Sequence, residues 1–255
     1  MVPISAASDD LTAVPDLGTA ALSDADFHPS VAGSHRRIDA DAWDTVYVVG
    51  DVHGCLDELR ALVATLDPSS DDLLVFVGDL VRKGPDSAGV VDFVRRHDNM
   101  VSVRGNNEDK LRRGDATLDG LDDAQRDYLT SLPVALSWGD SLAVHGGLDP
   151  TRPLAEQDAA SLLTCRSVPP GGGYDGPFWF ERYRGPPRVF FGHTVLAAPV
   201  RTEWAVGLDT GCVYGGSLTA YDCRADEFVS VPAGETYQSR ADDKVLDAAA
   251  FDWER

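Results

Sequence analysis

The chain has 255 residues, 43% of them hydrophobic, and carries 42 acidic against 22 basic residues for a formal net charge of −20. This length and apolar content suffice for the core of one large domain or two small ones. A strongly acidic protein repels nucleic acid at low salt, so we expect no nucleic-acid partner. The acidic residues are scattered and only three lysines are present, a composition that would suit a cytoplasm of high salt concentration.

No segment of the sequence is typical of membrane insertion or secretion. The longest apolar run, residues 73–78, is far too short to span a bilayer. The N-terminus has neither a basic start nor a continuous apolar stretch, so it is not expected to be a secretion signal. We therefore expect a cytoplasmic protein without a membrane partner, and its four cysteines are expected to be reduced because no CxxC pair is present.

The beginning of the chain differs in composition from the rest. Residues 1–40 are rich in Ala, Asp, Ser and Pro and show weak periodicity, which predicts a loosely structured N-terminal arm. Residues 41–232 are predicted to form the folded domain, and residues 233–255 a C-terminal tail.

From residue 45 onward, apolar β-branched runs alternate with helical patterns. The strands predicted in chain order are residues 45–50, 73–78, 100–104, 141–145, 188–191, 204–208, 217–221 and 227–231. Helices are predicted directly after the first two strands, since Leu56, Leu59, Val63 and Leu66 recur at helical spacing after the first. Strand–helix alternation followed by a strand-rich second half indicates an α/β fold with more than one sheet.

Two longer segments separate some of these strands. Residues 121–136 are predicted to form a helix that packs over the sheet through its apolar residues. Residues 166–187 form a connection rich in Gly, Pro and aromatic residues, and loops of this length are usually functional or disordered. Its aromatic side chains either stack on a nucleobase or, more simply, are buried against the second sheet.

A similar polar motif follows five of the predicted strands. In chain order these motifs are GDVHG from residue 50, GDLVRKG from residue 78, RGNNED from residue 104, HGG from residue 145 and GHT from residue 192. In open α/β sheets, ligands bind beyond the carboxyl ends of the strands, so five such loops would meet at one site. The glycines permit unusual backbone angles and the close approach of a ligand.

These loops bring six polar side chains toward a common centre. They are the candidate metal ligands Asp51, His53, Asp79, Asn106, His145 and His193. Imidazole, carboxylate and amide donors without thiolate suit Mn²⁺, Zn²⁺, Fe or Co²⁺ better than Ca²⁺ or Mg²⁺ alone. Because six ligands are too many for one ion with an open position, we expect two divalent ions that share a carboxylate.

Each of these residues also has an ordinary interpretation. An Asp before Gly is usually a turn former, and a single His is usually a hydrogen-bonded surface or core residue. His28, His35 and His97 are expected to be of that ordinary kind. The recurrence of Asp, Asn and His beside glycine after successive apolar strands favours the metal site.

The ordered motifs GDVHG, GDLVRKG, RGNNE, HGG and FGHT resemble those of the calcineurin-like metallophosphoesterases over about residues 44–222. They are most similar to the branch that holds Ser/Thr phosphoprotein phosphatases and symmetrical diadenosine tetraphosphatases. The resemblance implies a four-layer α/β/β/α sandwich with two mixed sheets and two metal ions. By matched position, it assigns Asp51 and His53 to one ion, Asn106, His145 and His193 to the other, and Asp79 to both.

The resemblance also implies a reaction. Phosphate esters or anhydrides would be hydrolysed by in-line attack of a metal-bound hydroxide, with Asp79 catalytic as the shared ligand. Lys83 stands where the family has the Arg of GDxVDRG, and it is the first candidate for binding the substrate's phosphate. Arg104 is a second candidate cation.

One motif departs from the family pattern. Where the family reads GNHE, with a His that protonates the leaving oxygen and is supported by the Asp of VDRG, this chain has Asn107 and Arg82. An amide cannot act as a general acid, and that loss costs about 10²- to 10⁴-fold in rate. The loss matters least when the leaving group is itself a phosphate. Asn107 is therefore a second catalytic position, and it favours a dinucleoside polyphosphate or another phosphoanhydride as the substrate.

Two alternatives remain open at this point. A protein Ser/Thr phosphatase acting on a phosphoprotein is supported by the order of the motifs and weakened by Asn107. A non-catalytic pseudo-phosphatase that binds metal or phosphoprotein is of another class, and the complete set of candidate ligands argues against it.

Overall fold

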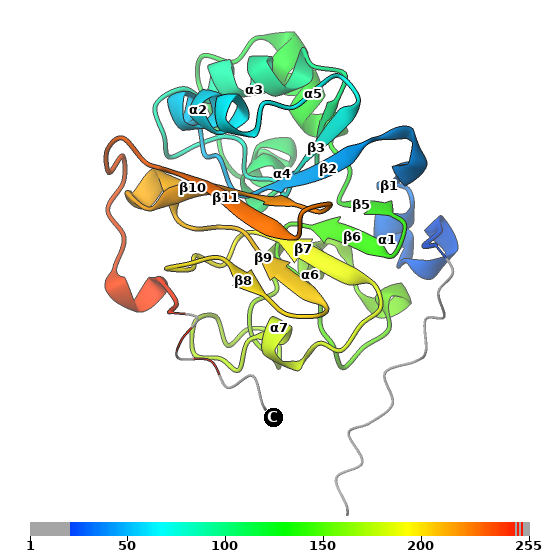
Figure 1. Cartoon of the computed structure of the whole chain (residues 1–255). Helices are drawn as coiled ribbons and strands as arrows, with labels where there is room; N and C mark the ends of the chain where they lie inside the picture. Colours follow the sequence, from blue (N-terminus) through cyan, green and yellow to red (C-terminus); the bar gives the residue numbers. More distant parts are fainter. Residues whose placement is uncertain (1–20, 248, 250, 252–255) are drawn as a thin grey trace, which may run out of the picture.

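The computed structural model describes residues 21–247, 249 and 251, and it consists of two β-sheets stacked face to face with helices on their outer faces (Figure 1). The predicted four-layer α/β/β/α sandwich with two mixed sheets is confirmed. Among the described helices, none has the length and apolar character needed to cross a bilayer.

The first sheet has five strands in the order β11-β10-β2-β3-β4. Their bounds are β2 (Thr45–Val49), β3 (Asp72–Phe76), β4 (Met100–Ser102), β10 (Ser217–Asp222) and β11 (Glu227–Pro232). Strands β2, β3 and β4 run parallel, and β10 joins them antiparallel beside β2. The carboxyl ends of the three parallel strands therefore lie at one edge of the sheet.

The second sheet has six strands in the order β1-β5-β6-β7-β9-β8. Their bounds are β1 (His35–Arg37), β5 (Ala135–Trp138), β6 (Ser141–Val144), β7 (Arg188–Phe191), β8 (Val200–Arg201) and β9 (Ala205–Gly207). Its central strands β6, β7 and β9 are parallel, so their carboxyl ends also lie together.

Helices cover the outer face of each sheet (Figure 1). The α-helices are α1 (Pro29–Ala32), α2 (Leu56–Leu66), α3 (Ser87–Arg95), α4 (Asn106–Arg113), α5 (Asp123–Ser131), α6 (Ala159–Thr164) and α7 (Trp179–Arg182). Short 3-10 turns are η1 (Asp24–Asp26), η2 (Ala40–Ala42), η3 (Leu154–Glu156), η4 (Cys212–Tyr214) and η5 (Asp242–Lys244). Helices α2, α3 and α5 pack on the five-stranded sheet, and α1, α6 and α7 pack on the six-stranded sheet.

Alternation along the strands builds three layers of apolar packing. In β2, Val46 and Val48 face the second sheet, whereas Val49 packs under the helices. Phe190 of β7 and Tyr221 of β10 meet in the layer between the sheets, with ring centroids 5.7 Å apart. Because side chains of a strand alternate between its two faces, each sheet contributes to the central layer and to one outer layer.

The expectation of a loose arm over residues 1–40 is wrong for its described part, residues 21–40. Strand β1 pairs in parallel with β5, and Leu22, Phe27 and Val31 are buried in the core under the six-stranded sheet. A few buried apolar side chains are enough to attach such a segment to the domain. The average composition of residues 1–40 does not reveal them, because most residues of the segment are polar or small. Residues 1–20 lie outside the described residues.

The predicted tail also packs on the domain in its described part. The backbone N–H of Gly234 donates to Glu58 Oε1, and that of Gln238 donates to the carbonyl of Val213. Leu246 forms an isolated bridge with Leu196. The segment that follows β11 is therefore part of the fold, and it runs back toward η4.

The helix predicted over residues 121–136 is shorter than expected. Helix α5 ends at Ser131, and residues 135–138 form β5 instead. Pro133 explains the stop, because proline cannot donate the helical hydrogen bond and restricts the residue before it. In the long connection, Phe178, Trp179 and Tyr183 are buried against the six-stranded sheet, as the simpler interpretation had it.

The layer between the sheets is expected to dominate stability. Phe190→Ala removes a side chain that is only 1% exposed, and we expect it to lower the free energy of unfolding by about 3–5 kcal/mol. Urea denaturation measures the loss. Phe228→Ala is the matched control, because Phe228 packs against the same cluster but is only partly buried and should cost clearly less. Equal losses for the two variants would contradict this account of the core.

Candidate metal centre

The loops that follow β2, β3, β4, β6 and β7 converge on one cavity of about 110 Å³. Its lining residues are Asp51, His53, Asp79, Lys83, Asn106, Asn107, Lys110, Arg166, His193, Val195, Asp209, Tyr214 and Arg240. His145 lies directly behind Asn106 and is fully buried. The structure thus brings together all six candidate metal ligands that the strand ends predicted.

Asp79 lies between two histidines. Its Oδ2 is 3.6 Å from His53 Nε2, and its Oδ1 is 3.4 Å from His145 Nε2. Each carboxylate oxygen therefore faces a different imidazole. A carboxylate presented in this way has the arrangement needed to link two neighbouring cations.

Two groups of donor atoms lie on either side of Asp79. On one side, Asp51 Oδ2 is 3.9 Å from His53 Nε2. On the other, Asn106 Oδ1 is 3.0 Å from His145 Nε2 and 3.0 Å from His193 Nδ1. Asp51, Asp79 and His145 can each offer a ligand atom within 4.8 Å of the other two, so the two groups are close together, and how they would divide between two ions stays a prediction.

The local backbone is strained where these side chains are presented. His53, Asp79 and His193 have φ values of 51°, 52° and 65°, in the left-handed region that residues with a Cβ rarely adopt. Hydrogen bonds hold the strained loops, among them one of 2.8 Å from the N–H of His53 to the carbonyl of Asp79. Such conformations persist only where the surrounding structure fixes them.

Glu108 is the main support of the Asp79 loop. Its Oε2 accepts hydrogen bonds from the N–H groups of Asp79 at 2.9 Å and Gly105 at 2.7 Å, and its Oε1 accepts one from Val81 at 3.2 Å. Burial, followed by the charge of Asp79, raises the pKa of Glu108 to about 7. This carboxyl group orients the Asp79 loop without facing the cavity.

The electrostatics of the centre are dominated by burial and by Asp79. Burial alone would raise the pKa of Asp79, but His145, His53 and Lys83 together hold it well below its ordinary value. Burial alone would lower the pKa of His145, yet Asp79 and Asp51 raise it to about 9. Asp79 and His145 thus each favour the charged form of the other.

In the other titratable candidate ligands, burial shifts the pKa toward the neutral form. Burial, with the charge of Asp209 beside it, raises the pKa of Asp51 well above its ordinary value. Burial lowers the pKa of His53 to about 3 and that of His193 well below its ordinary value. His193 Nε2 is buried without a hydrogen-bond partner. Neutral imidazoles and crowded carboxylates are what a site for divalent cations requires, so these residues fit such ions.

Asn107 is bound to Asp79 and to Arg82. Its N–H and its Nδ2 donate to Asp79 Oδ1 and Oδ2 at 2.8 Å and 2.5 Å, and its Oδ1 accepts from Arg82 Nη1 at 2.8 Å. The two residues that replace the family's acid pair are therefore in contact. Together they present a permanent positive charge and an amide where the family has an acid.

Of the two predicted substrate-binding cations, the structure places one in the cavity. Lys83 lines it, and its Nζ lies 2.7 Å from His53 Nε2. Arg104 does not line it. Its side chain is buried, donates to the carbonyl of Leu132 at 2.8 Å and lies 3.6 Å from Asp109, so the prediction that it binds phosphate is corrected. The guanidinium points toward the end of α5 because the carbonyl and the carboxylate there compensate its burial.

Sequence reasoning missed several residues of the cavity. Asp209 lies two residues past β9 in the stretch GLDTG, with a glycine two residues away on either side, so its place after an apolar strand could have indicated it. Arg166 and Arg240 come from the long connection and from the segment after β11, and the sequence carries no local signal for them. Arg166 lies over the ring of Tyr174 at 5.0 Å, and Arg240 over that of Tyr214 at 4.7 Å.

Comparison with known proteins adds independent information. Residues 45–216, which include all six candidate ligands, match the family model described as calcineurin-like phosphoesterase. The chain is 27% identical to bis(5'-nucleosyl)-tetraphosphatase PrpE [asymmetrical] of Oceanobacillus iheyensis, over 74% of this chain and 93% of the relative. It is 32% identical to serine/threonine-protein phosphatase 1 of Salmonella typhimurium, over 72% of this chain and 94% of the relative.

The fold has a counterpart among solved structures. A crystal structure whose protein carries the provisional name diadenosine tetraphosphatase matches with a TM-score of 0.71 at 32% sequence identity. The match covers 78% of this chain and 98% of that chain. The similarity therefore extends over the two sheets and the loops between them.

The close approach of Gly105 to Asp79 gives a test of the centre. A Cβ at residue 105 would lie 2.2 Å from both the N and the Oδ1 of Asp79, although the backbone there, with φ of −87°, accepts any residue. Gly105→Ala should therefore displace Asp79 and lower metal affinity and turnover by about 100-fold, as misplacements of about 1 Å do. Calorimetric titration with Mn²⁺ and initial rates measure the two effects.

Gly33→Ala serves as the matched control. Residue 33 has φ of −72° and no heavy atom within 4 Å of an added Cβ, so metal affinity and turnover should stay unchanged. Unaltered metal binding in Gly105→Ala would show that Asp79 is not held as the structure indicates.

Proposed function

The chain belongs to the calcineurin-like phosphoesterase family and is a metal-dependent phosphohydrolase, and we propose that it hydrolyses phosphoanhydrides, with dinucleoside polyphosphates as the first candidates. The observation that carries this proposal is the Arg82–Asn107 pair in contact with Asp79. Family membership alone does not separate anhydrides from esters, because relatives named for both reactions resemble the chain.

We assign the metal ligands as the matched motifs and the geometry suggest. Asp51 and His53 would hold one ion, Asn106, His145 and His193 the other, and Asp79, which lies between the two groups, would bind both. Mn²⁺ is the ion that best suits this mixture of oxygen and imidazole donors. Two bound ions would supply the nucleophile and polarise the phosphoryl oxygens.

The protein's own groups would then control the leaving group. Asn107 cannot give up a proton, so a leaving oxygen receives no general acid from this position. Arg82, fixed by its 2.8 Å hydrogen bond to Asn107, would instead stabilise a negative charge that develops there. A phosphate leaves readily as an anion, whereas a serine or threonine alkoxide requires a proton. This difference favours the anhydride.

A second cavity extends the site on the Asn107 side. It has a volume of about 520 Å³ and is lined by Arg82, Lys83, Asn107, Lys110, Tyr237 and Gln238. It shares Lys83, Asn107 and Lys110 with the metal centre, and its lining, within the described residues, includes no carboxylate. The three cations that line this cavity, Arg82, Lys83 and Lys110, would suit a substrate whose leaving group carries further phosphates.

The rival substrate is a phosphoprotein. The Salmonella relative is named a serine/threonine-protein phosphatase and shares 32% of its aligned residues with this chain. That relationship keeps a phosphoserine or phosphothreonine substrate under consideration. The contacts of Asn107 and Arg82 count against it.

Substrate choice can be tested by restoring the acid. The wild-type chain with Mn²⁺ should hydrolyse diadenosine tetraphosphate and inorganic polyphosphate well and a phosphoserine peptide poorly. Asn107→His should raise turnover of the peptide by about 10²- to 10⁴-fold relative to that of the anhydride, because only the alkoxide depends on a general acid. Phosphate release and chromatography of the nucleotide products measure the rates.

Asp98→His is the control, because Asp98 is exposed in the turn before β4 and does not line the cavity. It should leave both rates as they are. Efficient hydrolysis of the peptide by the wild-type chain would contradict the proposed preference, since another group would then protonate the alkoxide.

Metal dependence has a separate test. Stripping the chain with a chelator should abolish hydrolysis, and added Mn²⁺ should restore it. Asp79→Asn should lower the restored kcat at least about 100-fold, because the amide offers one oxygen where the carboxylate offers two. Asp140→Asn, in the exposed turn between β5 and β6, is the control and should be restored fully. Full restoration of Asp79→Asn would disprove the shared-ligand assignment.

A further inference from the structure

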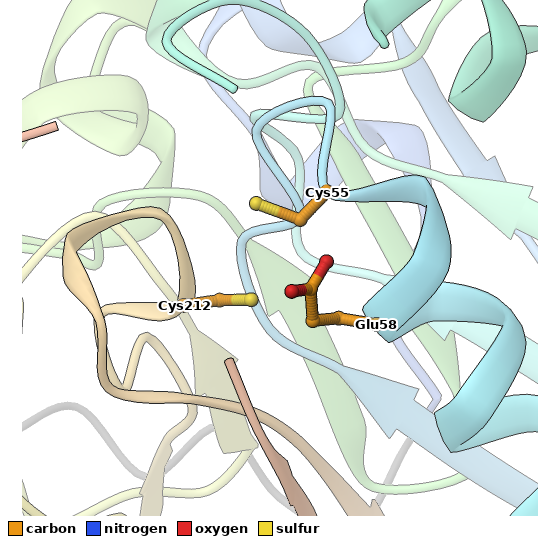
Figure 2. A group of neighbouring side chains, drawn as sticks. All are labelled: Cys55, Glu58 and Cys212. Carbon is orange, nitrogen blue, oxygen red and sulfur yellow. The ribbon is translucent and has the colours of Figure 1, made fainter. Parts of the chain in front are cut away.

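A second cluster of metal-binding side chains lies outside the centre described above. Cys55 precedes α2, Glu58 lies in the first turn of α2, and Cys212 begins η4. Figure 2 shows the three side chains as neighbours, with the Cys212 sulfur pointing toward the Glu58 carboxylate. One ligand atom from each residue lies within 4.8 Å of the other two, and the residues are only 0%, 5% and 2% exposed.

The hydrogen bonds of Glu58 leave one oxygen unexplained. Its Oε1 accepts from the N–H of Gly234 at 2.9 Å and from Tyr237 Oη at 3.0 Å. Its Oε2 is buried and has no hydrogen-bond partner among the residues that the structure describes. Buried carboxylate oxygens are nearly always satisfied, and leaving one unpaired costs several times an ordinary hydrogen bond. Among the described residues, this oxygen is therefore left available for a bound cation.

We propose that Cys55, Glu58 and Cys212 form a further cation site that takes a thiophilic divalent ion, Zn²⁺ in the first place. Two sulfurs and a carboxylate oxygen form a donor set typical of Zn²⁺, with bond lengths of about 2.3 Å and 2.0–2.2 Å. Around such an ion the donors lie about 3.5–3.8 Å apart, so side-chain movements of about 1 Å suffice. Binding releases the two thiol protons to solvent and gives Glu58 Oε2 its partner.

A disulfide between Cys55 and Cys212 explains the cluster less well. Oxidation would join the sulfurs and would leave Glu58 Oε2 buried without a partner. A cation uses all three groups at once. The site is also distinct in chemistry from the Asp79 centre, whose candidate ligands include no sulfur.

The cation would connect three parts of the chain that meet at the substrate cavities. Glu58 holds the segment after β11 through Gly234 and Tyr237. Tyr237 and the next residue, Gln238, line the larger cavity. An ion bound to Glu58 thus positions this segment beside the proposed anhydride site, although the ion site itself does not depend on that proposal.

Cobalt spectroscopy tests the site directly. The full chain, stripped of metal and titrated with Co²⁺ until all its sites are filled, should develop a sulfur-to-cobalt charge-transfer absorption in the near ultraviolet whose amplitude corresponds to one thiolate-bound Co²⁺ per chain. Zn²⁺ in excess over all the sites should abolish it. The Asp79 centre cannot produce this band because it has no thiolate, so the result is independent of any turnover.

Variants identify the ligands. Cys212→Ser should abolish the band, whereas Cys165→Ser, which alters another buried free thiol, should leave it intact. Glu58→Gln should keep the band and weaken Co²⁺ binding at least 10-fold, because both thiolates remain and one oxygen ligand is weakened. This variant tests the site even if Cys212→Ser does not fold. Absence of the band in the reduced wild-type chain, or its equal loss in Cys165→Ser, would overturn the proposal.

Discussion

The structure of the site depends on keeping the Asp79 carboxylate charged in a buried position. Asp79 is 1% exposed, and an unpaired buried charge of this kind would be prohibitively costly. Favourable charge interactions with His145, His53 and Lys83 stabilise the charged carboxylate, and Glu108 accepts a hydrogen bond from the backbone N–H of Asp79. The strained loops, the buried histidines and the glycines around them serve to hold the Asp79 carboxylate between His53 and His145, with one oxygen facing each imidazole.

The six candidate ligands could be predicted because each stands one to four residues beyond an apolar strand. A strand end limits where the next few residues lie, and parallel strands place their ends at the same edge. Asp51 and His53 after β2, and Asn106 after β4, required no knowledge of distant contacts. Asp209 follows the same rule after β9, and its omission was a failure to apply the rule rather than a limit of it.

The errors concern residues whose place depends on contacts far apart in the sequence. Arg104 stands at a strand end, yet the carbonyl of Leu132 and the carboxylate of Asp109 turn its side chain away from the cavity. Strand β1 exists only because β5 offers it an edge, a pairing between segments about 100 residues apart. Arg240 reaches the cavity through the packing of the chain after β11. No local pattern encodes such partners, so the direction of a single side chain could not be inferred.

The acidity of the whole chain and the cations of the cavity act over different distances. A net charge of −20 repels a polyphosphate at long range, and this repulsion falls as salt shortens the Debye length from about 10 Å at 0.1 M to about 3 Å at 1 M. Arg82, Lys83 and Lys110 would meet bound phosphates at contact distance, where screening is weaker. Concentrated salt thus removes the barrier to approach more than it weakens the bound state. Under the proposed function, the net negative charge of the chain and a polyanionic substrate would be compatible at high salt, because the proposed phosphate-binding cations Arg82, Lys83 and Lys110 line one cavity.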